Sequence, residues 1–443
     1  MNPAIYSLKN KQKVLSALDA LGFLISDADR DKYVNNFISE LKDALLGKKA
    51  SLQVLPSFVK FSSKVSCKDK IAVLEAGKST FSKGYFNVDE KCRVYGVMGY
   101  PMPGLGKEIS LDEFFRKIIF DARDVLRVCD RIGFCFDHAI EVNAKGDGKL
   151  LGWSRGEINV PELIERYIGE EFKKFLSEEF EKNYKIILLN DTVSTLIAGL
   201  VETNEKEFED FIGLVHSTGY NLSYIEEGKN IARLVDNKKY LNSQMVLNTQ
   251  AGSFSKVKES EVDESVKVHF KEIAMGEFSQ KVNSECLPVG LRVIVEKLSG
   301  KVLDPKVSKR ITEMSECDLE QIYSFLRAGL KSSLQLSSLF RHATLEDAAS
   351  LGVIIDRLFQ RAARLVAIQI SGILKYKNIG HNPIQPVGII VNGEFFEIVK
   401  DFEIRVRCEI AKYFGNSDPR YIKFLYVPNA TLLGAGIAAA INL

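Results

Sequence analysis

Hydrophobic residues recur every three to four positions in the first part of the chain. Val14, Leu18, Leu21 and Ile25 form one such series, and a second series runs over residues 33–45. This period puts apolar side chains on one face of a helix, so the spacing predicts two amphipathic helices.

From residue 71 the pattern changes to short runs in which apolar and polar residues alternate. IAVLEAG (71–77), TFSKGYFNV (80–88) and CRVYGVMGY (92–100) are separated by glycines and charged residues. This pattern predicts a β-meander. Residues 111–129 return to the helical period, and IGFCF (132–136) is typical of a buried strand.

The rest of the chain repeats this order of strands and helices. An amphipathic helix is expected over 160–182, and the Lys- and Ser-rich segment 253–267 is interpreted as a surface loop. We expect strands at 186–189, 211–216, 245–248, 387–393 and 424–427, with mostly helices over 263–375. Two α/β lobes around one cleft are the simplest architecture for this order.

Composition narrows the class of protein. The chain has 443 residues, of which 46% are hydrophobic and 27% charged, and no window approaches twenty uncharged apolar residues. These values exclude collagen, a disordered chain and a membrane span. The net charge of +2 disfavours nucleic acid as a partner. Neither nucleic acid nor a membrane is expected as a partner, and the oligomeric state stays open.

The cysteines indicate a reducing compartment. There are seven, an odd number without a CxxC pair, so we expect reduced thiols. Cys135 and His138 have metal-ligand spacing but lack a second pair, and no structural metal is predicted. Asp19 interrupts the first apolar stretch and no small-residue cleavage site follows it, so no signal peptide is expected and the cytoplasm is the predicted location.

The segment IILLNDTVSTLIAG (186–199) carries the clearest candidate chemistry. A buried strand ends at Asn190 and Asp191, and Thr192 can open a helix. At such a strand end Asp191 projects into the crevice where α/β sheets bind ligands, and it can accept a proton from a hydroxyl group. Aspartate is equally a preferred helix N-cap, so both interpretations stay open.

This segment resembles the VNDTVGTLMA motif of the hexokinase family, which contains that family's catalytic aspartate. Further motifs follow in the family's order, from about residue 65 to the C-terminus. They are IGFCFDH (132–138), similar to LGFTFSFP; LLGWSRG (150–156), similar to LIxWTKG; STGYN (217–221), similar to GTGTN; MVLNTQAGSF (245–254), similar to IINTEWGAF; and IIVNGEFF (389–396), similar to the VDGS strand.

The resemblance implies the α/β, two-lobed actin-like ATPase (ribonuclease H-like) fold with a central cleft. The implied divisions are N-terminal helices packing on the large lobe (1–64), a small lobe (65–192), a large lobe (193–430) and a C-terminal helix returning to the small lobe (431–443). The implied reaction transfers the γ-phosphoryl group of ATP to the 6-hydroxyl of glucose or a related hexose. Asp191 is then the general base, and Mg²⁺ is carried by ATP rather than by protein ligands.

The implied sugar site matches the family in part. It comprises Asp137, Ser154, Arg155, Asn190, Asn221, Gln250 and Glu272. Gln250 stands where the family has a glutamate, and an ungapped alignment puts Lys271 at a second glutamate position, which Glu272 fills if the alignment shifts by one. A carboxylate accepts hydrogen bonds from two hydroxyls, whereas glutamine has one acceptor and lysine has none.

The implied nucleotide site departs further from the family. It comprises Glu75, Gly77, Lys78, Ser79, Thr218, Gly219 and Gly434. The family's DLGGTNFR turn is EAGKSTFS (75–82) here, so Lys78 replaces a glycine and either crowds the phosphates or offers them its ammonium group. The GKS triplet lacks the spacing of a P-loop. NATLLGAGIAAAI (429–441) opens either a helix that faces an anion or an apolar core helix.

Three functions follow from these residues. The first is an ATP-dependent hexose kinase. The second is a hexokinase-like sugar-binding or sensor protein with lost or weak catalysis, which the altered phosphate turns motivate. The third keeps the chemistry but changes the acceptor, because Asp137, Gln250 and Lys271 all depart from the family. Trp153, next to the predicted sugar donors, is either close to the ligand or a core aromatic.

Overall fold

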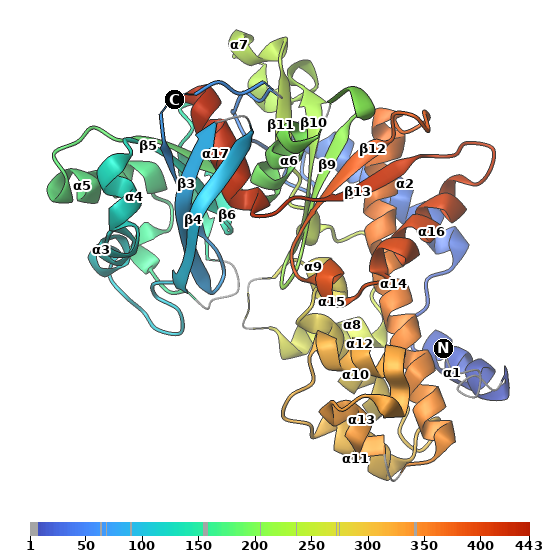
Figure 1. The fold of residues 1–443 in the computed structure, drawn as a ribbon. Coiled ribbons are helices and arrows are strands. Elements are labelled where there is room, and N and C mark those ends of the chain that lie inside the picture. The colour runs from blue at the N-terminus through green and yellow to red at the C-terminus, as the bar shows by residue number, and fades with distance from the viewer. Residues whose placement is uncertain are drawn as a thin grey trace.

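The computed structural model describes residues 8–443 except 63, 68, 89, 90, 154–157, 204, 236, 272, 274, 341 and 342. The chain is built around two mixed sheets, one on each side of the molecule (Figure 1). In each sheet a run of antiparallel strands is joined to two further strands that run parallel. The two α/β lobes expected from the sequence are therefore confirmed.

The small lobe contains the sheet with strand order β4-β3-β2-β5-β8. Its strands are β2 (Ile71–Ala76), β3 (Thr80–Val88), β4 (Cys92–Pro101), β5 (Arg131–Phe136) and β8 (Lys185–Leu189). The first three form the predicted antiparallel meander, and β5 and β8 run parallel to β2. A hairpin of β6 (Ala139–Val142) and β7 (Gly148–Gly152) extends this lobe; the sequence pattern did not predict it.

Helices cover one face of the small sheet through an apolar cluster. They are α3 (Leu111–Asp121), α4 (Arg123–Val128) and α5 (Ile168–Glu179). The helix predicted over 160–182 was too long, because residues 161–163 form a 3-10 turn that begins at Pro161 and α5 starts only at Ile168. The period over 111–129 belongs to two helices, which meet at Ala122.

The large lobe contains the sheet with order β1-β11-β10-β9-β12-β13. Its strands are β1 (Leu55–Pro56), β9 (Phe211–His216), β10 (Tyr220–Glu227), β11 (Gln244–Asn248), β12 (Val387–Asn392) and β13 (Ile422–Tyr426). The strands predicted at 211–216, 245–248, 387–393 and 424–427 are present, whereas β10 was missed.

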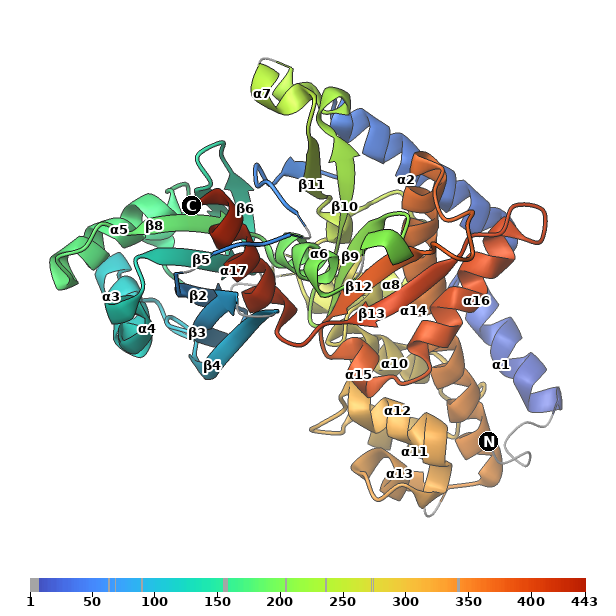
Figure 2. The ribbon, with the colours of Figure 1, turned by 45° about the horizontal axis from the view of Figure 1, so that its top comes forward.

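Most helices belong to the large lobe and to the helical group below it in Figure 1. They are α1 (Leu8–Ala20), α2 (Asp27–Leu45), α7 (Lys238–Leu241), α8 (Glu261–His269), α9 (Ser279–Val282), α10 (Cys286–Lys297), α11 (Pro305–Thr312), α12 (Leu319–Ala328), α13 (Gln335–Leu339), α14 (Leu345–Lys377), α15 (Phe395–Ile398) and α16 (Phe402–Phe414). The N-terminal helices α1 and α2 lie along the long helix α14 (Figure 2).

Segment 253–267 is only in part the loop that its composition predicted, because residues 254–260 lie outside helices and strands and the rest is helical. Helix α8 begins at Glu261, and Ser260 and Asp263 form a capping box at its start. Val262 and Val266 are buried on its inner face. Glu261, Glu264 and Lys267 are exposed on the outer face of this amphipathic helix, whereas Asp263 is buried in the capping box.

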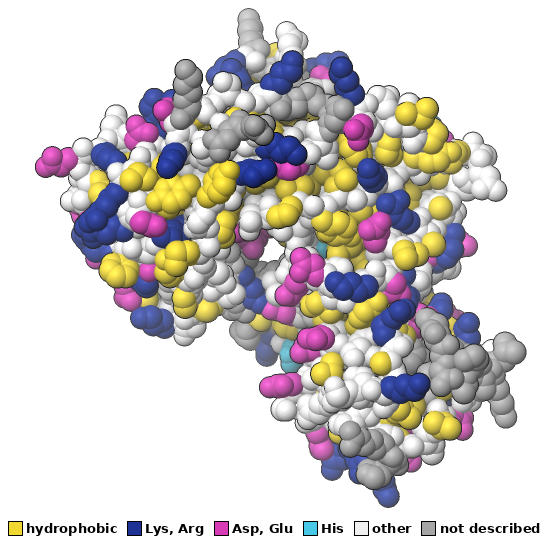
Figure 3. Space-filling view, viewed as in Figure 1, with side chains coloured by type: hydrophobic (Ala, Val, Ile, Leu, Met, Phe, Trp, Pro, Cys, Tyr) yellow, Lys and Arg dark blue, Asp and Glu magenta, His cyan; other side chains and the backbone are white. Residues whose placement is uncertain are grey.

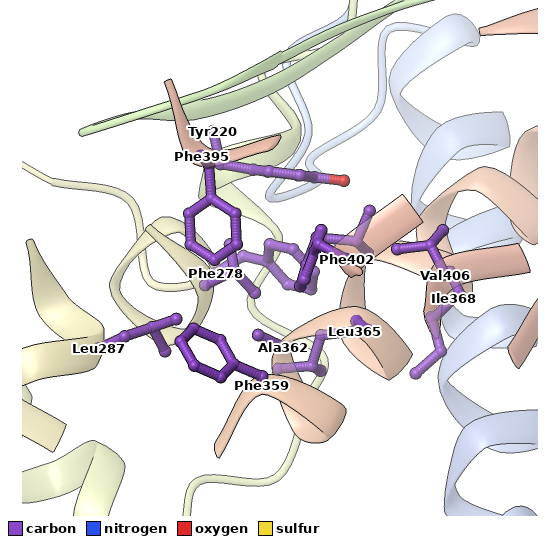
Figure 4. Packing of buried hydrophobic residues seen from close by; sticks show 14 of the residues in the cluster. Tyr220, Phe278, Leu287, Phe359, Ala362, Leu365, Ile368, Phe395, Phe402 and Val406 are labelled. Carbon is purple, nitrogen blue, oxygen red and sulfur yellow. The ribbon is translucent and has the colours of Figure 1, made fainter. Parts of the chain in front are cut away.

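An aromatic core connects these helices to the large sheet (Figure 4). The rings of Phe395 and Phe402 lie 4.6 Å apart, centre to centre, and the ring of Phe359 from α14 packs edge-on against Phe395 at 6.5 Å. Tyr220 packs against Phe278 at 5.2 Å. Since Tyr220 opens β10, this core supports the start of that strand.

Two helices fill the space between the sheets, α6 (Asp191–Glu202) and α17 (Ala430–Asn442). They cross closely, because a Cβ atom at Gly434 would lie 1.9 Å from the carbonyl oxygen of Ser194. On its other side α17 lies against β5, where a Cβ atom at Gly133 would lie 2.2 Å from the carbonyl oxygen of Ala435. Glycine is therefore required at both contacts. Within the described part of the chain, no helix is both long and apolar enough to cross a membrane.

We expect the substitution Gly434→Ala to lower the free energy of unfolding by about 1 to 3 kcal/mol, because the added methyl group overpacks a backbone contact. Gly152→Ala is the matched control, since its Cβ atom meets open space, and we expect a change within about 0.5 kcal/mol. Denaturant unfolding measures both. Equal stability of the two variants would mean that α6 and α17 do not cross this closely.

Candidate active site

A cleft of about 710 Å³ separates the two lobes. The opening between the lobes, bordered by acidic side chains, is visible near the middle of Figure 3. Eleven predicted site residues line it: Glu75, Gly77, Lys78, Ser79, Asp137, Asn190, Asp191, Thr218, Gly219, Asn221 and Gln250. Residues far apart in the sequence thus meet on one surface.

Asn190 and Asp191 occupy the floor of the cleft, where β8 runs into α6. Asn190 is the N-cap, since its side-chain oxygen accepts hydrogen bonds from the backbone N–H (3.2 Å) and the hydroxyl (2.6 Å) of Thr192. Asp191 is the first helical residue and is 5% exposed. The cap function that the sequence left open for Asp191 therefore belongs to Asn190.

Beside this floor, the side chain of Asn221 connects β10 to β11 and to the residues that follow β11. Its side-chain nitrogen donates to Asn248 Oδ1 (2.8 Å), and its oxygen accepts from the backbone N–H of Ala251 (3.0 Å). Asn248 Oδ1 also accepts from the backbone N–H of Gln250 (3.0 Å). These bonds hold Gln250 in the left-handed backbone region, with φ at 52°, where its side chain lines the cleft.

Asp137 and His138 line the cleft from the small lobe. The backbone N–H of Asp137 donates to Ala76 O (2.9 Å), which fixes the end of β5 against β2. His138 is buried and packs edge-on against Trp153, with ring centres 4.9 Å apart. Trp153 is a core aromatic, since its indole N–H donates to Val160 O (3.0 Å), but it lies directly behind a residue of the cleft wall.

Two tight turns face the cleft, one from each lobe. In the small lobe the N–H of Gly77 donates to Thr80 O (3.0 Å), which closes the turn between β2 and β3. In the large lobe the N–H of Ser217 donates to Gly219 O (2.9 Å), which closes the turn between β9 and β10. Hydroxyl groups and backbone N–H groups of such turns suit phosphate oxygens.

Lys78 does not simply obstruct the cleft. Its ammonium group forms an ion pair with Glu285, which precedes α10 in the opposite lobe. The pair connects the two sides of the cleft.

Glu75 lies at the end of β2, beside Asp191. Burial raises the pKa of its carboxyl group to about 7; the charge of Asp191 adds to the rise, and a hydrogen bond from the Thr431 side chain opposes it. Thr431 belongs to the first turn of α17, so this helix start contacts the cleft floor through Glu75.

Two further residues considered for the site, Gly434 and Lys271, are described by the structure and do not line this cleft. Gly434 is a correction: it is buried against α6 because the two helices need a glycine where they cross. Lys271 is exposed and does not line the cleft. Ser154, Arg155 and Glu272 lie outside the described residues.

The polar residues that sequence reasoning missed include Gln53 and Glu394, which line the cleft, and Glu285, which pairs with Lys78. Glu394 stands inside the IIVNGEFF motif, so the motif itself was a signal for it. Gln53 precedes β1, whose two residues are too few for a strand pattern. Glu285 reaches the cleft only through its long-range contact with Lys78, which no local pattern reveals.

Comparison with protein families bears out the resemblance. The family model described as Hexokinase matches residues 211–441, and a second model with the same description matches residues 20–201. The chain belongs to the hexokinase family.

Curated members of the hexokinase family are similar over much of the chain. A glucokinase of Aspergillus niger is 22% identical over 356 residues, which is 70% of this chain and 68% of that protein. Hexokinase-2 of Oryza sativa subsp. japonica is 22% identical over 339 residues, or 70% of this chain and 64% of that protein. The match therefore spans about two thirds of the length of these relatives.

Solved hexokinase structures share the fold. The hexokinase from Schistosoma mansoni, complexed with glucose, covers 98% of this chain and 100% of its own, with a TM-score of 0.78 and 19% identity. A second hexokinase structure gives a TM-score of 0.74 at 17% identity over the same shares. The predicted fold class, two-lobed and actin-like, is confirmed.

We expect Glu75→Gln to stabilise this hexokinase-family chain more at pH 8 than at pH 5. The wild-type carboxyl group has a raised pKa, so the folded state holds its proton more tightly than the unfolded state, and stability falls as the pH rises from about 4.5 to about 7. Glutamine removes that loss. The gain should reach about 1 to 3 kcal/mol, since a tenfold change in protonation corresponds to about 1.4 kcal/mol.

Denaturant unfolding at both pH values measures this gain. Glu207→Gln, at an exposed residue, is the control and should give no such difference. A gain that is the same at pH 5 and pH 8 would show that Glu75 titrates normally.

Proposed function

We propose that this chain transfers the γ-phosphoryl group of MgATP to the 6-hydroxyl of glucose or a related hexose, with Asp191 as the general base. One observation carries this proposal: Asp191 is a buried carboxylate on the cleft floor, and its neighbour Asn190 performs the helix-capping function in its place. A carboxylate held there is available for proton transfer from a hydroxyl group.

The orientation of the base comes from the start of α6. The backbone N–H of Thr192 donates to Asp191 Oδ1 (2.7 Å), and the cap at Asn190 fixes the preceding peptide. The carboxylate is therefore preorganised to accept the proton of the sugar hydroxyl as that oxygen attacks. Asn190, Asn221, Gln250 and Asp137 are the proposed sugar-binding residues.

The two turns suit the phosphate groups of a nucleoside triphosphate. Ser79 and Thr80 on one side, and Ser217 and Thr218 on the other, line the cleft and carry hydroxyl groups, and Lys78 adds a cation. MgATP supplies the reactive phosphoryl group, and its metal ion neutralises part of the developing charge. The chain positions this donor between the turns and brings the hexose to Asp191.

A second function has a specific observation in its favour. Glu75 and Glu394 line the cleft with the phosphate turns, and Glu285 engages Lys78. These carboxylates oppose phosphate binding, as expected for a hexokinase-like sugar-binding or sensor protein with weak catalysis. A panel of hexoses tests the third function, a changed sugar acceptor.

We expect Asp191→Asn to lower kcat by about 10² to 10⁴, because it removes the base, while sugar affinity stays within a few-fold of wild type. A coupled assay with MgATP across several hexoses gives kcat, and calorimetry gives the sugar affinity. The exposed Asp112→Asn is the control and should match wild type. If Asp191→Asn turned over like wild type, Asp191 would not be the general base. If wild type bound sugar without turnover, the sensor function would be favoured.

We expect a bound hexose to change the fluorescence of Trp153, the single tryptophan of the chain. A sugar that contacts Asp137 or His138 moves the ring packed against the indole. Emission is recorded during titration with D-glucose, and calorimetry shows whether the sugar is bound. Unchanged emission at saturation would mean that the sugar leaves the His138 wall undisturbed.

A further inference from the structure

The ion pair between Lys78 and Glu285 joins the lobes at the phosphate turns. Lys78 comes from the β2–β3 turn of the small lobe, and Glu285 lies directly before α10 of the large lobe. Their side chains are 18% and 32% exposed, so the pair is partly shielded from water. It connects residues that are 207 positions apart in the sequence.

The backbone around Glu285 is hydrogen-bonded to the large-lobe turn. The side-chain oxygen of Asn283 accepts from the backbone N–H of Glu285 (3.0 Å) and of Cys286 (2.7 Å). The backbone N–H of Ser284 donates to Ser217 O (3.0 Å), so this segment is bonded to the turn that ends at Gly219. The backbone that carries the Glu285 side chain is therefore held beside the large-lobe turn.

The charges that line the cleft explain why this ion pair affects phosphate binding. Among the described residues that line the cleft, Lys78 is the single lysine or arginine, whereas the carboxylates are Glu75, Asp137, Asp191 and Glu394. Phosphate oxygens need a cationic partner, and a carboxylate offers an ammonium group the same kind of anionic oxygen. Glu285 and a nucleotide phosphate thus compete for one cation.

We propose that Glu285 is an affinity-determining residue that occupies Lys78 when no nucleotide is bound and is displaced from it by nucleotide phosphates. The inference rests on the proposed function in placing the phosphates between the two turns. Lys78 can bind phosphate only in molecules in which Glu285 has released it. The apparent affinity for nucleotide therefore falls as the fraction of molecules with the Lys78–Glu285 pair rises. Removing the competing charge should raise that affinity.

A second interlobe ion pair provides a matched control. Among the described residues, Arg233 of the large lobe and Glu141 of β6 also meet across the lobes, at 3.1 Å, but neither lines the cleft. Their side chains are 44% and 45% exposed. Glu141→Gln therefore removes an interlobe attraction without touching the phosphate turns.

The first test measures the affinity of the full chain for MgATP and for magnesium tripolyphosphate by calorimetry. We expect Glu285→Gln to bind both about three to five times more tightly than wild type, which is the range expected for a partly exposed ion pair. Glu141→Gln should bind both like wild type. Equal affinity of Glu285→Gln and wild type would overturn the inference, and an equal gain in both variants would assign the effect to lobe opening instead.

A double-mutant cycle with Lys78→Met separates competition from simple repulsion. Lys78→Met alone should weaken both ligands by about tenfold or more, because it removes a charged donor. In that background Glu285→Gln should improve affinity less than it does beside Lys78. The same gain in both backgrounds would mean that Glu285 only repels phosphate and does not compete for Lys78. Melting temperatures check that each variant is folded.

Failure of this inference is distinguishable from failure of the proposed function. Tripolyphosphate binding needs no sugar and no turnover, so the predicted affinity pattern without hexose phosphorylation would refute the kinase and leave the competition intact. Hexose phosphorylation together with unchanged phosphate affinity in Glu285→Gln would refute the competition and leave the kinase function intact. No binding of either phosphate ligand to any variant would overturn the inference, whatever the turnover assay shows.

Discussion

The close crossing of α6 and α17 is the contact on which the rest of the structure depends. On one side α17 lies against β5 of the small sheet through Gly133. On the other side α6 lies on the large sheet, where a Cβ atom at Gly213 of β9 would meet the carbonyl oxygen of Thr192 at 2.7 Å. The two sheets are therefore joined through a pair of helices whose spacing leaves no room for side chains at these points.

This spacing determines where the candidate chemistry lies. Since Asp191 is the first residue of α6 and β8 ends directly before it, the position of α6 between the sheets fixes the carboxylate at the cleft floor. The same arrangement brings Thr431, at the start of α17, to Glu75. The position of the predicted base is thus a consequence of one helix crossing, whereas the raised pKa of Glu75 comes from burial and is opposed by the Thr431 hydrogen bond.

Electrostatics of the cleft are the second constraint. A site for a polyanionic donor would be expected to present several cations, whereas the described lining has Lys78 alone and four carboxylates. Under the proposed function, charge neutralisation comes from Mg²⁺ on the nucleotide and from the proposed exchange of partners at Lys78. That proposal couples binding of the donor to the ion pair that joins the lobes.

Much of the fold was predictable because it follows local patterns. Alternating runs gave the meander of the small sheet, and the NDT segment gave the strand end with Asp191. The sequence patterns failed where contacts between distant segments determine the local structure. Residues 261–267 were interpreted as part of a surface loop because the segment is rich in Lys and Ser, although they belong to α8, and Gly434 was assigned to the nucleotide because the sequence does not reveal that α6 crosses there.

At the site, residue types and order predicted the lining but not the partners. Whether Asp191 or Asn190 caps α6 depends on side-chain geometry, which the sequence left open. The partner of Lys78 was unpredictable for a related reason, since Glu285 meets it only after both lobes have folded and come together.

The most direct test of the account is the position of the phosphoryl group in the product. Wild-type protein is incubated with MgATP and a hexose that calorimetry shows to bind, and the product is analysed by phosphorus–proton correlation NMR. The account predicts a phosphorus signal coupled to the two protons on C6 of the sugar. A bound hexose that stays unphosphorylated, or a phosphorus signal coupled to another position, would contradict it.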